Sequence, residues 1–140
     1  MKIKSAENEI EINILQRSNP DTDDYWDANW LESVVTIHVT GFQCSYSSNL
    51  RVEDFQRFHN DLIMLKNLLK KEIEFTTMEE GLNMHFQTDQ NGLITCNGKA
   101  KNDAGNCLSF QFVLDITSLE NCIGELEALL RSYPIIGSLD

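Results

Sequence analysis

The chain has 140 residues, of which 41% are hydrophobic and 24% charged, a composition typical of a globular domain and unlike that of a disordered chain. Its 22 acidic and 11 basic residues leave a formal net charge of −11, which repels phosphate groups and so disfavours nucleic-acid and anionic-membrane partners. We therefore predict a single domain over residues 1–140; the sequence does not indicate its oligomeric state.

The cysteines and the N-terminal residues indicate the cellular compartment of the protein. No Cys-x-x-Cys pair or neighbouring histidine accompanies the four cysteines, so a zinc site is not indicated. Residues 1–9 lack the apolar run of a signal peptide, and no segment approaches the ~20 apolar residues that span a bilayer. We expect a cytoplasmic protein with free thiols, at Cys44, Cys96, Cys107 and Cys122.

Three strands are predicted in the first third of the chain. Residues 9–15 alternate isoleucines with polar residues, which is the period of a half-buried strand. Residues 16–24 are polar and form a loop. Residues 31–39 are β-branched and alternate, which predicts a second strand, and residues 42–48 return from Gly41 as a less regular third strand.

The rest of the chain reads as helix, short strands and helix. Residues 52–71 form an amphipathic helix, since apolar residues recur every three or four positions, at Phe55, Phe58, Leu62, Leu65, Leu68 and Leu69. Thr117 and Glu120 match a capping box that starts a second helix, which Pro134 ends. Between the helices we predict strands at residues 73–76, 82–88, 93–100 and 107–116.

These elements predict an α+β fold, in which a mostly antiparallel, meander-rich sheet is packed on one face by two α-helices. The other face is expected to be solvated and is a candidate binding surface. It would carry the polar side chains of His38, His85, Gln87 and Gln111.

The sequence does not indicate an enzyme. No nucleophile elbow, phosphate-binding glycine loop or metal-ligand spacing occurs, so we predict no catalytic residue, cofactor or metal ligand. One alternative stays open, in which His38 and His85 meet across the sheet beside loop carboxylates and form a metal or acid–base cluster.

Acidic residues gather in two segments. Between Glu7 and Glu32 only Arg17 opposes eight acids, and residues 72–80 carry four glutamates and no base. Such segments suit a basic protein partner, or they are solvated edges that oppose strand-to-strand aggregation. With the adjoining aromatic pair, the predicted partner-binding residues are Asp21, Asp23, Asp24, Tyr25, Trp26, Glu72, Glu74, Glu79 and Glu80.

Both tryptophans lie in this first segment. Trp26 is interpreted as an exposed binding residue, because aromatic side chains are enriched at interface centres. Trp30 precedes an apolar strand and is predicted to be buried. Asp27 and Asn29 are predicted to hold the intervening turn by side-chain-to-backbone hydrogen bonds.

The stretch Asp27-Ala28-Asn29-Trp30-Leu31 runs into a Val/Ile strand, and a Phe-x-Phe-x-Leu-Asp strand later leads into a capped helix. In these motifs and in the order of its elements, from about Ile10 to Tyr133, the chain resembles the WapI-type immunity proteins. This resemblance implies a non-enzymatic antitoxin that binds and occludes a cognate toxin domain, commonly a nuclease. The alternative is a stand-alone protein- or small-ligand-binding domain with no toxin partner.

Overall fold

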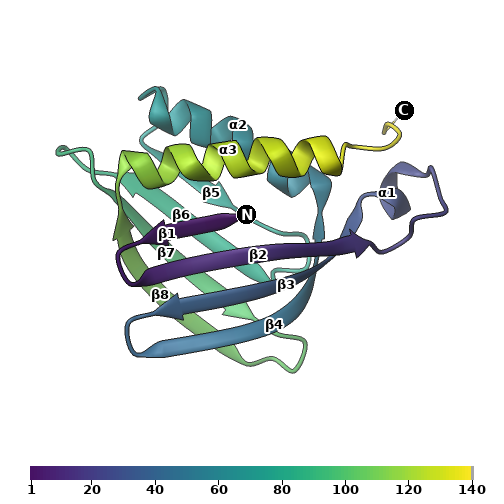
Figure 1. Cartoon of the computed structure of the whole chain (residues 1–140), viewed down its shortest axis with the longest axis horizontal. Coiled ribbons are helices and arrows are strands. Elements are labelled where there is room, and N and C mark those ends of the chain that lie inside the picture. The colour runs from purple at the N-terminus through teal and green to yellow at the C-terminus, as the bar shows by residue number, and fades with distance from the viewer. Residues whose placement is uncertain (140) are drawn as a thin grey trace.

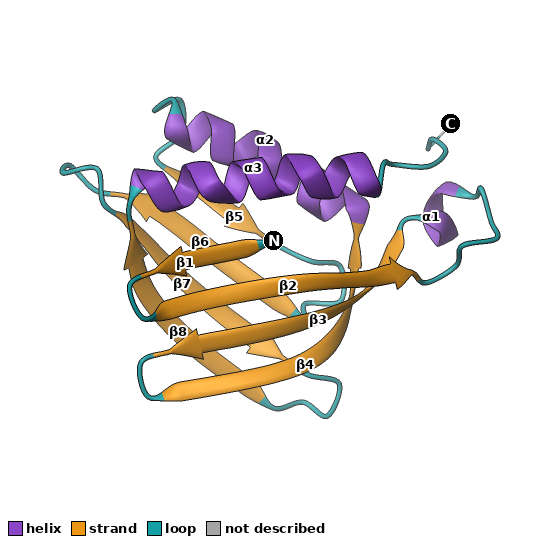
Figure 2. Ribbon diagram, viewed as in Figure 1, coloured by secondary structure: helices purple, strands orange, loops and turns teal. Residues whose placement is uncertain are grey.

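The computed structural model describes residues 1–139 and contains two four-stranded antiparallel sheets and two long helices (Figures 1 and 2). The first sheet has the order β1-β2-β3-β4 and the second has the order β5-β6-β7-β8. The first set of strands spans Lys2–Ser5, Asn8–Arg17, Trp30–Val39 and Phe42–Arg51, and the second Glu72–Phe75, Leu82–Thr88, Ile94–Lys101 and Cys107–Leu114.

Each sheet is followed by a helix, α2 (Val52–Lys66) after the first and α3 (Ile116–Ser132) after the second. The two helices lie side by side along one end of the sheets, near β1 and β5, as Figure 1 shows. A short helix, α1 (Tyr25–Ala28), interrupts the long connection between β2 and β3. The chain thus runs twice through four strands and a helix.

One hydrophobic core joins the inner faces of both sheets to the helices. In β3 the residues at every second position, from Leu31 to Val39, are buried, as their alternation predicts. Phe58 of α2 lies 5.0 Å from Phe75 of β5 and 5.5 Å from Phe86 of β6, measured between ring centroids. These aromatic contacts attach α2 to the second sheet.

The predicted α+β class with antiparallel strands and two helices is confirmed, but the strands form two sheets where one was expected. Lys2–Ser5 is a strand that the sequence analysis missed, because four residues show too little alternation. His38 and His85 lie on different sheets, so the alternative in which they meet across one sheet is wrong. A metal or acid–base cluster that contains both histidines is therefore excluded.

The helix ends also differ from prediction. α2 stops at Lys66 and not at residue 71, and Leu68 adopts a positive φ of 59° outside it. Leu68 and Leu69 are consequently 77% and 74% exposed. The N-cap of α3 is Asp115, two residues before the predicted Thr117, because Asp115 accepts a hydrogen bond from the Ser118 amide at 2.9 Å.

Candidate functional site

Arg51 holds the region that contains both tryptophans. It is the last residue of β4 and only 1% exposed. Its guanidinium donates to the carbonyl oxygens of Trp26 at 2.7 Å and Tyr25 at 3.2 Å, and to the Glu53 carboxylate at 2.6 Å. Because a guanidinium is planar and carries five donors, one side chain satisfies two backbone carbonyls of α1 and a carboxylate of α2.

Three aromatic rings surround the same guanidinium. Its central carbon lies 5.5 Å from the ring centroid of Tyr25, 5.2 Å from that of Trp26 and 4.9 Å from that of Trp30. Cation–π attraction within about 6 Å favours this arrangement. Trp30 is consequently half-buried against Arg51 and not a member of the core, which corrects the prediction for this residue.

Two other side chains fix α1 from its ends. The Asp24 carboxylate accepts hydrogen bonds from the amides of Trp26 at 3.1 Å and Asp27 at 3.2 Å, and so caps the helix. Asn29 is fully buried and bonds the carbonyl oxygen of Tyr25 as well as both backbone groups of Ile136, at 2.8–2.9 Å. The predicted role of Asn29 in the turn is confirmed, whereas Asp24 takes the role expected of Asp27.

With its backbone held in this way, Trp26 keeps its side chain 52% exposed. The Tyr25 ring meets it edge-on, with 5.2 Å between centroids and an interplanar angle of 83°. Burial and the neighbouring Glu53 carboxylate raise the pKa of Tyr25, so the phenol stays neutral at physiological pH. Trp26 is thus an exposed aromatic side chain on a rigid support.

A hollow of about 320 Å³ opens beside this aromatic pair. Across it lie residues of the β5–β6 loop, among which Met78 is 59% exposed. Two buried oxygens there, Oγ1 of Thr77 and Oε1 of Glu53, have no hydrogen-bond partner in residues 1–139. The hollow is lined by Tyr25, Trp26, Arg51, Glu53, Asp54, Arg57, Thr76, Thr77 and Met78.

Asp54 also lines this hollow, and it accepts hydrogen bonds from the Arg51 amide at 3.2 Å and from Arg57 at 2.9 Å. Burial raises the pKa of its carboxyl, although both hydrogen bonds oppose the shift. Its bond to the Arg51 amide caps α2. Asp54 is therefore already engaged and is a structural part of the site.

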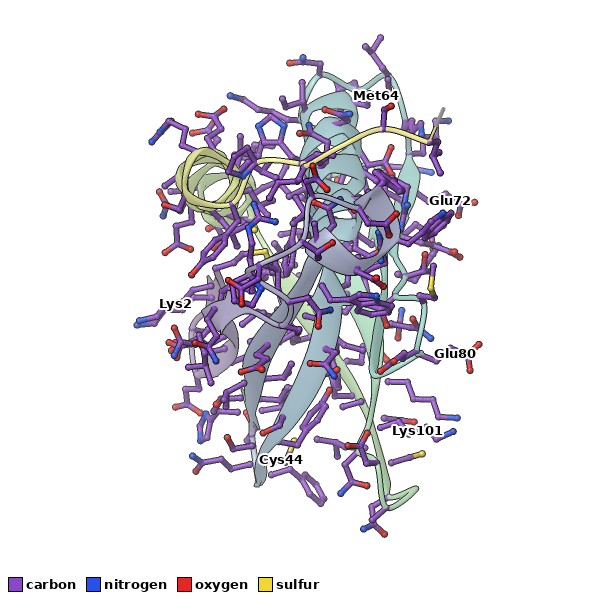
Figure 3. All side chains as sticks on the ribbon, turned by 90° about the vertical axis from the view of Figure 1, so that its right-hand side faces the viewer. Lys2, Cys44, Met64, Glu72, Glu80 and Lys101 are labelled. Carbon is purple, nitrogen blue, oxygen red and sulfur yellow. The ribbon has the colours of Figure 1, made fainter. Side chains whose placement is uncertain are left out.

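The structure brings together the aromatic end of the first segment and the β5–β6 loop, since Tyr25 and Trp26 line the same hollow as Met78, which precedes Glu79 and Glu80. Glu72 and Glu74 occupy the outward positions of β5, between buried Ile73 and Phe75. Figure 3 shows Glu72 and Glu80 along one side of the molecule. All the acids of the predicted set, Asp21, Asp23, Asp24, Glu72, Glu74, Glu79 and Glu80, are exposed.

Arg51 is the residue of the candidate site that sequence reasoning missed. The only signal for Arg51 in the sequence is its place after an uncharged strand and before the acidic first turn of a helix, which carries Glu53 and Asp54. That pattern does not show that Arg51 would lie under α1, because the contact joins residues 25 positions apart. Burial of the charge depends on the tertiary structure.

The histidines are spread over three elements, and each has a separate partner. The closest contacts join His38 to the Glu7 carbonyl at 2.9 Å, His59 to Glu127 at 3.3 Å and His85 to Glu72 at 3.4 Å. Within residues 1–139 no group of three or more histidine, cysteine or acidic side chains is placed to hold a metal ion. All four cysteines are free thiols, of which Cys96 and Cys122 are buried.

None of the helices described in residues 1–139 combines the length and apolar character needed to cross a membrane. The structure is that of an α+β protein that exposes acidic side chains and a supported aromatic pair. A model of the WapI-like immunity protein family matches residues 2–134, so the chain belongs to that family. Membership implies immunity to a toxin, in a family that is typically non-enzymatic.

No curated protein matches the sequence significantly. Among solved structures, the chain is similar to one described as the crystal structures of Trypanosoma bruciei MRP1/MRP2. The sequence identity is 10%, the TM-score is 0.47, and the match covers 91% of this chain and 86% of the other.

Proposed function

We propose that this immunity protein binds and occludes a basic, nuclease-type toxin domain through the surface formed by α1, the loop before it, β5 and the β5–β6 loop. The observation that carries the proposal is the anchoring of the Tyr25–Trp26 pair by buried Arg51, beside two exposed acidic segments. Its proposed contact residues are Asp21, Asp23, Asp24, Tyr25, Trp26, Glu72, Glu74, Glu79 and Glu80.

Charge supports a basic partner. The chain carries a net charge of −11, and a nuclease that accepts RNA or DNA presents cationic side chains to phosphate groups. Carboxylates on this surface take the place of those phosphates. Electrostatic attraction of this kind mainly raises the association rate and selects against acidic partners.

The aromatic pair supplies the short-range part of the binding. Trp26 is held by its backbone and by the stack on Arg51, so it loses little conformational freedom when a partner covers it. Interface residues that contribute most to binding are typically tryptophan, tyrosine or arginine at the centre of a contact. The hollow next to Trp26 provides room for a partner side chain.

The first experiment measures, by calorimetry, binding between this chain and the C-terminal domain of the toxin-like protein that family membership leads us to expect beside its gene. We expect tight binding at 50 mM NaCl that weakens about tenfold or more at 300 mM, since salt screens exposed charges. If the two proteins do not bind, the proposed function is wrong. A complex that is insensitive to salt would contradict the acidic-surface mechanism alone.

Replacing Trp26 tests the centre of the surface. Trp26→Ala is expected to weaken binding about 30-fold, the loss typical of a dominant interface residue. Leu69→Ala removes another exposed apolar side chain, in the turn that follows α2, and should change affinity less than about threefold. Thermal unfolding of both variants serves as the check that the fold is kept.

A further inference from the structure

The outer edge of β4 is an unpaired strand edge. β4 pairs with β3 through ten consecutive residue pairs, from Trp30↔Arg51 to Val39↔Phe42, without a register shift. In residues 1–139 no strand pairs with its other side, and the backbone from Phe42 to Leu50 makes no further backbone hydrogen bond. Alternate amides and carbonyls along this strand therefore face outward without a protein partner.

The other three sheet edges are each short and charged or partly covered. β1 is covered by α3, whose Glu125 carboxylate accepts a hydrogen bond from the Lys2 amide at 2.7 Å. On β8, the Val113 carbonyl accepts a hydrogen bond from the Ser5 hydroxyl at 2.6 Å. β5 has only four residues, two of which are glutamates. Short length, charge and covering are the usual ways in which proteins prevent pairing with a foreign strand.

β4 is neither short nor charged, although the β7–β8 hairpin borders its N-terminal half, where Cys44 and Ser45 line the same hollow as Cys107. It is ten residues long, and from Phe42 to Leu50 it contains no charged residue, no proline and no bulge. Its outward side chains include Ser45, Ser47 and Asn49, which are too small to screen the backbone. An edge of this kind is competent to add a strand from another chain.

A hollow of about 290 Å³ adjoins the C-terminal half of this edge. Three carboxylates from different elements reach it, those of Glu32, Glu79 and Asp103, and no basic side chain lines it. Leu15, which is 56% exposed, supplies an apolar contact. The lining is completed by Ser33, Ser47, Ser48 and Asn49.

β4 also contacts the chain segment that leads into β6. Figure 3 shows Cys44 in β4, Glu80 in the β5–β6 loop and Lys101 in β7. The Tyr46 hydroxyl donates to the Gly81 carbonyl at 2.6 Å, and Ser48 occupies the space where a side chain at Gly81 would lie. The inward residues Cys44, Tyr46 and Ser48 are only half-buried, whereas the inward residues of β3 are buried.

We propose that the β4 edge binds an extended segment of the cognate toxin as a fifth strand, with lysine or arginine side chains of that segment directed into the hollow of Glu32, Glu79 and Asp103. This inference rests on the proposed function, and Glu79 belongs to both surfaces. Main-chain hydrogen bonds provide the affinity and the carboxylates select basic side chains. A second copy of this chain fits poorly, because it carries the same charge of −11.

Hydrogen exchange measured by NMR on the full chain, alone and with the neighbouring toxin domain, tests the pairing. In the free protein, alternate amides from Phe42 to Leu50 are expected to exchange fast because they lack a partner. In the complex these same amides should exchange about tenfold or more slowly. Unchanged exchange along β4 in a complex that does form would overturn this inference while leaving the proposed function intact.

Charge reversal tests the hollow. Asp103→Lys is expected to weaken toxin binding about tenfold or more, since it places a like charge opposite the incoming basic side chain. Glu7→Lys makes the same charge change at an exposed position in the β1–β2 turn, and should alter affinity less than about threefold. Equal effects of the two substitutions would mean that only net charge matters, and the hollow would have no role.

Two further results would contradict the binding of a toxin strand at the β4 edge. If the free chain sediments as a dimer whose β4 amides are protected, the edge belongs to self-association and the inference is wrong. If the wild-type chain does not bind the toxin domain, the proposed function fails, and this inference fails with it.

Discussion

At the scale of single residues, Arg51 is the one buried cation on which the candidate site depends. Its side chain is 2% exposed and contacts α1, α2 and three aromatic rings. Burying a charge is unfavourable unless it is paired and hydrogen-bonded. Here the pairing with Glu53 and the two backbone carbonyls offsets that cost and fixes the position of α1.

Removal of this cation should therefore be severe. Arg51→Met is expected to lower the free energy of unfolding by about 3–5 kcal/mol, because it leaves the Glu53 carboxylate and two carbonyls without their partner. Urea unfolding followed by tryptophan fluorescence measures the change. Arg131→Met, at an exposed position near the end of α3, is the matched control and should cost less than about 0.5 kcal/mol.

At the scale of elements, two glycines have opposite roles. Gly98 lies in β7, where the Phe110 ring of β8 occupies the space of the missing side chain. Gly124 lies in α3, and a methyl group there would meet nothing within 4 Å. The strand glycine makes room for an aromatic ring of the core, whereas the helix glycine only adds backbone freedom.

The same substitution at these positions should have effects of opposite sign. Gly98→Ala is expected to lower the free energy of unfolding by about 1–3 kcal/mol, because Phe110 must move out of a packed position. Gly124→Ala should raise it by about 0.5–1 kcal/mol through the higher helix propensity of alanine. Chemical unfolding of both variants measures the two changes, and a gain in stability at Gly98 would contradict the described packing.

At the scale of the whole molecule, the acid excess acts on stability as well as on binding. A net charge of −11 places many exposed carboxylates near one another, and this self-repulsion disfavours the compact state. Few surface cations offset this repulsion. One of them is Lys2, whose ammonium lies 3.4 Å from the Glu11 carboxylate and 3.9 Å from the Glu9 carboxylate. Such exposed pairs contribute little, with a median of about 0–1 kcal/mol.

Salt should therefore stabilise the free chain. Raising NaCl from about 50 to about 500 mM shortens the screening length from roughly 14 Å to roughly 4 Å, so the melting temperature is expected to rise by several degrees. Differential scanning calorimetry measures the shift. A melting temperature that falls over this range would show that surface ion pairs outweigh the repulsion.

Local periodicity was sufficient for most elements. The alternation at Ile10, Ile12 and Val35 predicted β2 and β3, and the helical spacing from Phe55 to Leu65 predicted α2. The exposure of Trp26 was also predicted correctly. The N-cap of α3 was missed because Asp115 and Thr117 both suit that position, and their backbone conformation decides between them.

The sequence by itself determined the α+β class, the order of the main elements, the acidic character and the resemblance to the immunity family, since these depend on side-chain patterns that are local along the chain. Only the tertiary structure divided the strands into two sheets, placed Arg51 under α1 and left β4 with an open edge. Hydrophobic periodicity shows which face of an element is buried, but not which element covers it. The partner of each face is set by packing between residues far apart in the sequence.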